Sequence, residues 1–533
     1  MSRVQTLSER LCRVADAHPD RHCVSDRPYG RFTYGQIAEQ IERVAFGLTQ
    51  RGIGKGDMVI AQLPNWVPFL VFHLALTRIG AITALIPITF REHEVRNAVK
   101  LTCAKAIIVP ATFAGHDYKA MASSVGNSLN VPLEIILVYG GEGQSSQSEL
   151  SYENLLASRP GAIAGIPVGL NDLTAICFTS GTTGALKAAM FDTQILHATN
   201  QGLQSRYGLN ADDRILGCSP VGHAVGFTHT LRMTITIGGS IALLDRWDAE
   251  DALRTAQAEG SAFMAGATPF LMDIVYHPAL KQHNRLRSVR LFLCGGATIP
   301  RQLMKDARKA LPGTFTSPLW GMTECGGVTT CPFDAPSEKL FTSDGVPCDG
   351  MEARVVDAAG RPLALGQEGE LQVRGKMITH GYFGEPELTR EVYLPDGFFR
   401  TGDQARIDND GYVRITGRIK DLIVRGGVNI APAEIEQILF THPAITNAAV
   451  VGMPDPRLGE RVCAFVTTTG PDLPDLEDIT DWMNRNGISK QKWPERLEIV
   501  KNLPMTSSKK IQKFRLRQMI TQTLEARPAD TDP

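Results

Sequence analysis

One short segment of the chain gathers hydroxyl, glycine and lysine side chains directly after an apolar stretch. The segment Thr-Ser-Gly-Thr-Thr-Gly occupies residues 179–184, Lys187 follows it, and the apolar run 173–178 before it predicts the end of a buried strand. Glycines let the backbone turn tightly and present N–H groups to an anion, hydroxyls add donors, and a lysine adds positive charge. These residue types predict a loop that holds a polyphosphate, although their spacing does not fit the common Gly-x-x-x-x-Gly-Lys-Ser/Thr phosphate loop.

Four later motifs complete a pattern that resembles the adenylate-forming superfamily. They are Trp320-Gly321-Met322-Thr323-Glu324, Thr401-Gly402-Asp403, Gly417 to Asp421 with Gly426-Gly427, and Lys510-Ile511-Gln512-Lys513. A short loop rich in glycine and threonine is a weak signal by itself, but five motifs in the family's order make the match specific. Within the superfamily, the chain resembles the acyl-CoA synthetase branch, and in particular ligases of medium-chain and alicyclic acids.

The resemblance implies an ATP-dependent, AMP-forming acid–thiol ligase that works in two steps. A carboxylic acid first displaces pyrophosphate from ATP to give an acyl-adenylate, and CoA then attacks to give the thioester and AMP. Because the acid and the triphosphate are both anions, the enzyme has to neutralise charge where they meet. The resemblance therefore also implies that the chain binds ATP, Mg²⁺ and CoA.

The phosphate end of the nucleotide site is expected at the loop and at one carboxylate. Lys187 would add positive charge, and Thr323 belongs to the same catalytic set. Glu324 would hold Mg²⁺ together with a loop threonine, because hard magnesium prefers oxygen ligands; taken alone, it would be a capping or surface carboxylate. The resemblance implies that the phosphates are cradled by Thr179, Ser180, Gly181, Thr182, Thr183 and Gly184, with Thr182 or Thr183 as the loop's metal ligand.

The nucleoside end is expected where small residues end a strand and where a carboxylate follows a glycine. Small residues allow flat stacking of adenine, and an aromatic residue would form the opposite wall. A carboxylate has several acceptor sites and suits the two ribose hydroxyls, whereas an arginine would contact ribose or phosphate. Taken singly, the small residues would be an ordinary loop after a strand, the carboxylate would be a turn aspartate, and the arginine would belong to a structural ion pair. The expected residues are Gly295, Gly296, Ala297, Trp320, Gly321, Asp403 and Arg418.

Two lysines in the last part of the chain are expected to act in different steps. The resemblance implies that Lys510 bridges the substrate carboxylate and the α-phosphate when a small domain swings inward. Lys420 lies where the family has its hinge, between the adenylating and the thioester-forming arrangement; taken alone, it is a solvated lysine. After the rotation, Gly426 and Gly427 would line a tunnel for pantetheine, because side chains would block it.

The acid pocket is expected around the segment 220–227. Its sequence, Pro-Val-Gly-His-Ala-Val-Gly-Phe, resembles one that gates and lines the pocket in acyl-CoA synthetases, and His223 is the candidate gate. A lone histidine is otherwise a packed or capping residue. Amino-acid-activating relatives have an aspartate where this chain has Ala224, so the pocket is expected to be apolar and the substrate a hydrophobic carboxylic acid. The expected lining residues are His223, Ala224, Val225, Gly226, Phe227, Ala265, Gly266 and Ala267.

Three residues depart from the family pattern near the phosphate chemistry. Leu186 replaces a proline, Ala188 replaces a glycine, and Lys509 replaces the glycine before Lys510. If that glycine has a positive φ, a lysine costs about 1–2 kcal/mol there, and its charge would misaim Lys510 or lower the pKa of its ammonium. One hypothesis is that adenylation is weakened and a partner ligase supplies a preformed acyl-adenylate. The favoured alternative is that the changes are tolerated drift.

Other functions fit the sequence less well. The first is transfer of the acyl group to a carrier protein instead of CoA. The sequence shows no obvious basic surface that would decide between the two acceptors. The second is a non-catalytic protein that binds a nucleotide or an acyl-adenylate; the retained Glu324, Asp403 and Lys510 speak against it. A serine hydrolase is disfavoured because no Gly-x-Ser-x-Gly elbow is present.

Composition agrees with a globular enzyme of more than one domain. The chain has 533 residues, of which 43% are hydrophobic and 21% charged, and this length is sufficient for several cores. A net charge of −1 gives no sign of attraction to nucleic acid or to anionic membranes. Ten cysteines without a Cys-x-x-Cys pair favour a reducing cytoplasm over a disulfide framework or zinc site. The most apolar stretch, 67–90, contains polar residues and predicts a buried helix and a strand instead of a membrane span.

Helices and strands alternate in the part of the chain that would position these residues. A helix at 34–51 and strands at 58–62 and 106–109 predict sheets covered by helices in an α/β fold. Later, short strands at 352–357, 369–373 and 412–415 predict a small β-barrel subdomain.

The resemblance adds a domain organisation to this reading. It implies a large N-terminal adenylate- and acyl-binding domain at 1–417 and a hinge at 418–420. A smaller, mobile α+β domain would follow at 421–533, with a helix at 433–441.

Overall fold

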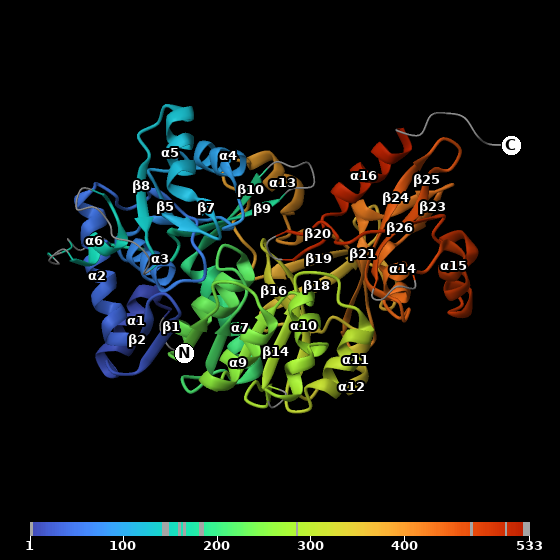
Figure 1. Ribbon diagram of the computed structural model, residues 1–533, viewed down its shortest axis with the longest axis horizontal. Coiled ribbons are helices and arrows are strands. Elements are labelled where there is room, and N and C mark those ends of the chain that lie inside the picture. The colour runs from blue at the N-terminus through green and yellow to red at the C-terminus, as the bar shows by residue number, and fades with distance from the viewer. Residues whose placement is uncertain are drawn as a thin grey trace.

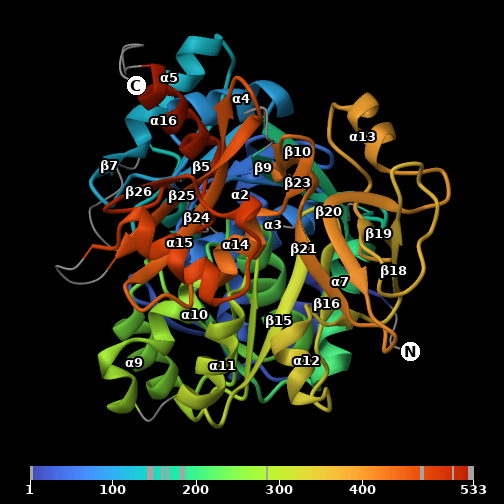
Figure 2. The ribbon, with the colours of Figure 1, turned by 90° about the vertical axis from the view of Figure 1, so that its right-hand side faces the viewer.

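The computed structural model describes residues 4–140, 149–157, 161, 163, 167–180, 186–283, 286–468, 473–506 and 509–525. Figure 1 shows a large body and, beside it, a smaller orange-to-red body formed by the last part of the chain. After a turn of 90°, the smaller body lies in front of the larger one (Figure 2). The predicted α/β fold with a large N-terminal part and a smaller C-terminal part is therefore confirmed.

A nine-stranded sheet forms one half of the large body, in the order β17-β16-β15-β14-β13-β11-β12-β1-β2. Its central strands are parallel, and β2, β16 and β17 add antiparallel edges. The strands are β1 (His22–Asp26), β2 (Gly30–Thr33), β11 (Arg214–Gly217), β12 (Ser240–Leu243), β13 (Phe263–Gly266), β14 (Leu291–Gly295), β15 (Phe315–Met322), β16 (Gly326–Thr330) and β17 (Val346–Pro347).

A six-stranded sheet forms the other half, in the order β10-β9-β4-β3-β5-β8. All neighbours are parallel except the antiparallel pair β9 and β10, which flanks the predicted phosphate loop. The strands are β3 (Met58–Ala61), β4 (Ile82–Leu85), β5 (Ala106–Pro110), β8 (Glu134–Val138), β9 (Leu173–Ser180) and β10 (Leu186–Asp192), and a separate hairpin joins β6 (Thr112–Phe113) and β7 (His116–Asp117).

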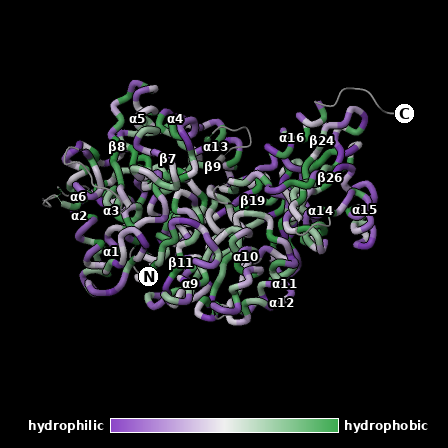
Figure 3. The backbone as a smooth tube through the Cα atoms, viewed as in Figure 1, coloured by the Kyte–Doolittle hydropathy of each residue, from purple (hydrophilic) through white to green (hydrophobic). Residues whose placement is uncertain are grey.

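Alternating strand residues bind these sheets to layers of helices. In β3, Val59 and Ala61 belong to the core between the sheets, whereas Ile60 belongs to the core on the outer face, because successive side chains of a strand point to opposite faces. Helices α1, α2, α3, α7 and α8 contribute to the inner core, α9 to α11 cover the outer face of the larger sheet, and α4 and α5 that of the smaller sheet. Figure 3 shows the hydrophobic strands inside and the hydrophilic segments outside.

The helices of the large body follow the order of the chain. They are α1 (Leu7–Ala17), α2 (Tyr34–Gln50), α3 (Val67–Ile79), α4 (Glu92–Thr102), α5 (Tyr118–Leu129), α6 (Tyr152–Ala157), α7 (Thr193–Tyr207), the π-helix η1 (Val225–Arg232), α8 (Met233–Ile237), α9 (Ala249–Glu259), α10 (Thr268–Val275), α11 (Arg301–Ala310), α12 (Ser337–Thr342) and α13 (Pro386–Val392). The predicted helix at 34–51 and the predicted helix and strand within 67–90 are thus confirmed. Across the described residues, no helix is both long and apolar enough to cross a membrane.

A third sheet is antiparallel and open. It contains β18 (Met351–Val356), β19 (Gly369–Gly375), β20 (Phe399–Ile407) and β21 (Val413–Arg418) in that order. The strands were predicted correctly, but the predicted barrel was wrong, because β18 and β21 remain the two edges of the sheet. Four strands are too few to close around a filled interior. Instead, buried residues such as Leu371 and Val373 join the main core.

The smaller body is a five-stranded sheet with helices on both faces. In β24, Ala448 and Val450 face the core shared with α14 and α15, whereas Ala449 and Val451 face the core shared with α16. The predicted helix at 433–441 corresponds to α14. The elements are β22 (Ile423–Arg425), β23 (Val428–Ile430), α14 (Pro432–Leu439), β24 (Ile445–Asp455), β25 (Gly459–Thr468), α15 (Leu476–Arg485), β26 (Arg496–Ile499) and α16 (Lys513–Glu525).

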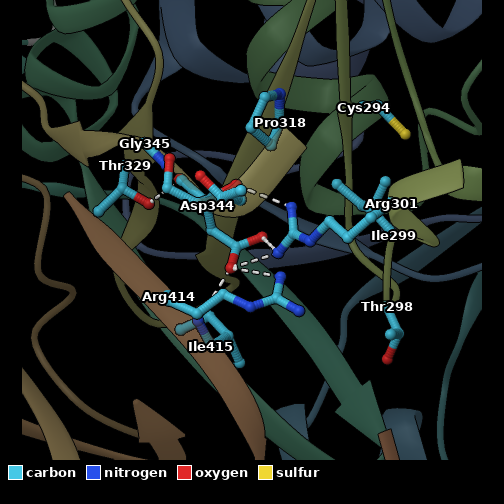
Figure 4. A network of polar contacts seen from close by, with 12 residues as sticks. Cys294, Thr298, Ile299, Arg301, Pro318, Thr329, Asp344, Gly345, Arg414 and Ile415 are labelled. Atoms are coloured by element: carbon cyan, nitrogen blue, oxygen red, sulfur yellow. Dashed lines mark hydrogen bonds and ion pairs between the residues drawn. The ribbon is translucent and has the colours of Figure 1, made fainter. Parts of the chain in front are cut away.

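A buried ion-pair network holds β21 directly before the chain enters the smaller body. Arg301 Nη2 lies 2.8 Å and 2.9 Å from the two carboxylate oxygens of Asp344, and Ile415 N donates to Asp344 Oδ2 at 2.8 Å (Figure 4). Arg301 begins α11, and its backbone N–H donates to Gln437 Oε1 of α14 at 2.9 Å. The network therefore connects α11, β21 and the smaller body, and a short 3₁₀ turn, Ile419–Asp421, follows β21.

Candidate active site

A pocket opens at the carboxyl ends of the parallel strands β11, β13, β14 and β15. This edge of an open α/β sheet is where ligands commonly bind, because loops from neighbouring strands diverge there. Lys510, which comes from the smaller body, completes the wall of the pocket. The lining residues at the strand ends are Ser219 and Pro220 after β11, Ala267 after β13, Gly295 and Gly296 at the end of β14, and Gly321, Met322 and Thr323 of β15 and its turn.

The Lys510 side chain enters this pocket on a tight turn of the backbone. Thr506 N donates to Lys510 O at 2.8 Å, and Lys510 N donates to Thr506 Oγ1 at 3.0 Å. The side chain is open to the pocket but surrounded by protein. Burial lowers the pKa of Lys510, and the cations Arg418 and Lys420 lower it further.

Positive charge exceeds negative charge around Lys510. Arg418 and Lys420 are its cationic neighbours, and Glu324 and Asp403 are the carboxylates that oppose them. Burial lowers the pKa of Lys420, as does Arg418, and Lys187 acts on Lys420 across the same site. Such a surplus of cations suits a ligand with several negative charges.

Asp403 is the carboxylate with the most defined surroundings. Trp320 Nε1 donates to its Oδ2 at 2.9 Å, and Arg418 Nε lies 2.5 Å from its Oδ1. The contact with Arg418 is an ion pair that lacks hydrogen-bond geometry. The buried Oδ1 therefore accepts no hydrogen bond from the described residues. Burial raises the pKa of Asp403, although Arg418, Trp320 and Lys510 oppose the rise. Oδ1, which is ion-paired but accepts no hydrogen bond from the described residues, could accept one from a hydroxyl of a ligand.

Glu324 lies on the turn between β15 and β16 and is buried. Tyr382 donates a hydrogen bond from its hydroxyl to Glu324 Oε1 at 2.7 Å. Burial is the main cause that raises the pKa of Tyr382 far above its usual range, and the charge of Glu324 is the second. A carboxylate oxygen is a ligand type that Mg²⁺ accepts. Among the described residues, no three His, Cys, Asp or Glu side chains lie together so that they could hold a metal. A magnesium ion here would therefore need oxygen ligands from the nucleotide.

Most of the predicted phosphate loop lies outside the described residues. This applies to Gly181, Thr182, Thr183 and Gly184 and to the side chain of Ser180. Thr179 pairs with Lys187 across the β9–β10 ladder, so the two strands bring the ends of the loop together. Lys187 Nζ lies 5.4 Å from the centre of the ring of Tyr382, the residue whose hydroxyl donates to Glu324.

The small residues at the predicted adenine site are required by close backbone approach. A Cβ atom at Gly295 would lie 2.1 Å from Leu319 O, and one at Gly321 would lie 1.9 Å from Gly326 O. Gly296 follows Gly295 with a φ of +81° and, unlike Ala297, lines the pocket. Trp320, across the strand end, is fixed by its bond to Asp403.

Four of the residues predicted to bind the acid line this pocket. His223, Ala224, Val225 and Ala267 line the pocket. Burial lowers the pKa of His223 to about 4, and Lys510 contributes, so its imidazole is neutral near pH 7.

The other predicted lining residues pack elsewhere. Gly226 lies against the backbone, where a Cβ would be 2.3 Å from Pro220 O, and Phe227 packs on Phe69 and His73 in the core. Ala265 and Gly266 belong to β13 below the rim. None of these four is among the residues that line the pocket.

Several lining residues were not predicted, and they make the pocket less apolar than expected. Val225 to Arg232 form a π-helix, whose longer turn brings residues four and five positions apart onto one face. Thr228 and His229 therefore face the pocket with Ala224 and Val225. Burial lowers the pKa of His229 to about 4, and its Nδ1 has no hydrogen-bond partner in the described part of the chain. The further lining residues that were missed are Phe191, Thr199, Ser219, Pro220, Phe270, Leu319, Met322, Gly326 and Gly327.

Lys509 stands beside Lys510 but does not keep that residue out of the pocket, which Lys510 lines. Lys509 has a φ of +59°, the positive φ that was considered for this position, and its side chain pairs with Asp273. The cations that lower the pKa of Lys510 are Arg418 and Lys420. Ala188 causes no conflict either, because its side chain is fully buried in the core next to β9. Leu186 begins β10 and pairs with the backbone of Ser180.

Gly426 and Gly427 do not line the pocket in this arrangement. They form the two-residue turn between β22 and β23, with φ values of +57° and +83°. Two-residue hairpin turns with positive φ at both positions favour glycine for conformational reasons alone. Their presence is therefore explained by the hairpin, and the tunnel stays a prediction.

Comparisons with known proteins match this architecture along nearly the whole chain. The model of the AMP-binding enzyme family matches residues 11–383, and the model of the AMP-binding enzyme C-terminal domain matches residues 434–510. The crystal structure of ATP-bound MatB from Rhodopseudomonas palustris superimposes with a TM-score of 0.86 at 27% identity, and it covers 97% of this chain and 100% of that chain.

Two relatives of different activity are also similar over most of their length. The medium-chain fatty-acid–CoA ligase of Escherichia coli (strain K12) is 34% identical over 520 residues, which are 97% of this chain and 91% of the relative. The salicyl-AMP ligase / salicyl-S-ArCP synthetase of Mycobacterium tuberculosis (strain ATCC 25618 / H37Rv) is 31% identical over 518 residues, which are 96% of this chain and 90% of the relative.

Proposed function

The chain belongs to the AMP-binding enzyme family, and we propose that it is an ATP-dependent acyl-CoA synthetase. It converts a hydrophobic carboxylic acid to the CoA thioester through an acyl-adenylate. The observation that carries this proposal is the position of Lys510, whose side chain lines the pocket within electrostatic range of Glu324 and Asp403. The relative with medium-chain fatty-acid–CoA ligase activity supports the choice of acid and acceptor.

The chemistry that this site can perform follows from its charges. A carboxylate is a poor electrophile, and ATP supplies the AMP group that turns the carboxylate oxygen into a good leaving group. Lys510 would hold the acid's carboxylate against the α-phosphate, with the positive charge of Arg418 beside it. Lys187 would add positive charge on the side of Lys420. Asp403 would hold the ribose, because its buried Oδ1 accepts no hydrogen bond from the described residues and is offset only by the ion pair with Arg418. Preorganised charges of this kind stabilise a transition state without reorganisation during the reaction.

Glu324 is the residue that we propose as the protein ligand of Mg²⁺. Its carboxylate is buried, and Tyr382 donates to only one of its two oxygens. Thr183, proposed as the second protein ligand, lies outside the described residues. A bound Mg²⁺ would add positive charge at the phosphates.

The acid is proposed to occupy the part of the pocket beyond His223. Val225, Phe270 and Leu319 give it apolar walls, whereas Thr228 and His229 add hydrogen-bonding groups. Both imidazoles are neutral near pH 7, since burial lowers their pKa to about 4. We therefore expect acids without a second negative charge.

We propose that the chain works as two domains, 1–417 and 421–533, that rotate about the hinge 418–420. The present arrangement places Lys510 in the pocket and suits adenylation. For thioester formation, the smaller domain would turn so that Lys510 leaves and the turn at Gly426 and Gly427 approaches the site. The short connection between β21 and β22 supports this proposal, because no strand pairing crosses it.

Transfer to a carrier protein is the second candidate function. The relative that is both a salicyl-AMP ligase and a salicyl-S-ArCP synthetase favours it, since that enzyme delivers its acyl group to a carrier. Acceptance of a preformed acyl-adenylate from a partner ligase is the least favoured candidate, because Lys509 pairs with Asp273 and Ala188 is buried, and Lys510 still lines the pocket.

Separate assays of the two half-reactions test the proposed function. Acid-dependent exchange of pyrophosphate into ATP is measured with a panel of alkyl, alicyclic and aromatic acids, and thioester formation is measured from synthetic acyl-adenylates. We expect both reactions with one acid, and CoA as the acceptor. Thioester formation without exchange would show that adenylation has been lost, and acyl transfer to a carrier protein but not to CoA would favour the second candidate.

A further inference from the structure

Lys509, the residue before Lys510, makes an ion pair between the two bodies. Its Nζ lies 2.9 Å from Asp273 Oδ2, and Asp273 is in α10 of the large body. Nζ also lies 5.9 Å from the centre of the Phe270 ring, and Phe270 lines the pocket. We propose that Lys509 is a positioning residue, and that its pair with Asp273 is a latch that holds Lys510 in the adenylating arrangement. This inference rests on the proposed function, because it requires two arrangements of the smaller domain.

The partner of Lys509 is held in place before the latch forms. Trp247 Nε1 donates to the same oxygen, Asp273 Oδ2, at 2.7 Å. The Trp247 ring packs edge-on against Phe270, with 4.4 Å between the ring centres. The carboxylate therefore keeps Trp247 as a hydrogen-bond donor when Lys509 leaves, so release of the latch does not leave Asp273 without a partner.

The backbone of Lys509 indicates that its side chain has a role in this arrangement. Its φ of +59° lies in the region that disfavours every residue with a Cβ atom. Glycine would fit this turn without strain, whereas lysine is held there by the contacts of the turn and of its side chain. Strained residues of this kind point to a local constraint that the surrounding structure imposes. Here the contact that glycine could not make is the ion pair with Asp273.

The latch differs in kind from a second contact between the bodies. Gln437 of α14 bonds to Ile299 O and Arg301 N at the start of α11, and both bonds are between neutral groups. The side chains of Lys509 and Asp273 are 34% and 39% exposed, so salt reaches this pair and screens it. The adenylating arrangement should therefore become less favoured as ionic strength rises, through Lys509 and Asp273.

The test compares the two half-reactions in four variants of the full chain. Lys509→Gly removes the charge and the strain, Asp273→Asn removes the charge but keeps an acceptor for Trp247, and the exchange Lys509→Asp with Asp273→Lys restores a pair of opposite polarity. Lys492→Gln is the matched control, because it breaks a 2.8 Å ion pair with Glu434 within the smaller body. Acid-dependent pyrophosphate exchange and thioester formation from a synthetic acyl-adenylate are measured at low and high salt.

We expect each single latch variant to lower the exchange rate about two- to fivefold, the range for a partly exposed ion pair, while thioester formation is unchanged or faster. The salt dependence of exchange should shrink, the double exchange should restore part of the rate, and the control should behave like the wild type. Equal effects on both half-reactions, or no effect on either, would overturn the latch. Absence of both half-reactions in the wild-type chain would instead overturn the proposed function and the latch with it.

Discussion

The indole N–H of Trp320 donates to Asp403 Oδ2 over 2.9 Å, and the second oxygen of Asp403 stays buried without a donor among the described residues. This hydrogen bond and the ion pair of Oδ1 with Arg418 fix the orientation of the carboxylate. Because the two residues come from different sheets, β15 and β20, the bond also ties the third sheet to the rim of the pocket. An acceptor prepared in this way is suited to a hydroxyl of a ligand.

Replacement of Asp403 by asparagine tests this role. The amide keeps an acceptor for Trp320 but loses the charge and one acceptor oxygen. We expect kcat/KM for ATP in pyrophosphate exchange to fall about 10- to 100-fold, the value of one hydrogen bond to a charged group. The effect should appear with every acid in the panel. Thioester formation from a preformed adenylate, in which the ribose is also bound, serves as a second readout, and unchanged ATP kinetics would contradict the assignment.

Gly321 should tolerate no side chain. A Cβ atom there would lie 1.9 Å from Gly326 O, and a backbone atom of a paired strand cannot move away cheaply. We expect Gly321→Ala to lower the free energy of unfolding by about 2 kcal/mol or more, measured by urea denaturation. Gly54→Ala is the matched control, because a Cβ at Gly54 meets nothing within 4 Å, and its effect should stay within about 1 kcal/mol. Equal effects of the two substitutions would rule out the steric explanation.

The sequence predicted which residues share the site better than it predicted the shape of the site. Trp320, Asp403 and Lys510 are far apart in the chain, and all three belong to predicted motifs; in the structure Trp320 donates to Asp403, and Asp403 acts electrostatically on Lys510. Local periodicity was enough for helices such as α2 and strands such as β3, because their apolar residues follow a regular pattern. The packing of the third sheet was not predicted, since closure depends on the number of strands and not on their pattern.

The acid pocket shows where local reasoning stops. An α-helical or extended reading of 223–227 points Phe227 toward the substrate, whereas the π-helix places Thr228 and His229 there. The longer turn of a π-helix changes the face on which a side chain lies, and no residue pattern in this segment predicts a π-helix. Lys509 is a similar case: its strained backbone could be anticipated, but its partner Asp273, far earlier in the chain, could not.

Asp344 should contribute strongly to stability through the network that fixes β21. Removing one partner of a buried ion pair leaves the other charge uncompensated and typically costs about 3–5 kcal/mol. We expect Asp344→Asn to fall near the lower end of this range in urea denaturation, because the amide retains one acceptor for Arg301 or Ile415. Arg361→Gln, which breaks an exposed pair with Asp357, should change stability by no more than about 1 kcal/mol. A similar loss in both variants would contradict the network's importance.

His229 should make the folded chain less stable in mild acid. Burial lowers the pKa of His229 to about 4 in the folded chain, whereas an unfolded histidine titrates near 6.5. Between these values the unfolded chain binds a proton that the folded chain does not. Stability therefore rises with pH in this window and is lost as pH falls from about 6.5 to 4. The full shift corresponds to about 3 kcal/mol.

His229→Gln removes this titration while it keeps a polar side chain of similar size. We expect the free energy of unfolding, measured by urea denaturation between pH 4 and pH 7, to fall less steeply toward acid in the variant than in the wild type. The comparison concerns slopes, so a constant loss of stability caused by the substitution does not affect it. His223 titrates in the same window, because burial lowers its pKa to about 4 as well, and the variant should therefore keep part of the slope. Parallel curves for the two proteins would show that His229 is already protonated in the folded chain or is accessible to water.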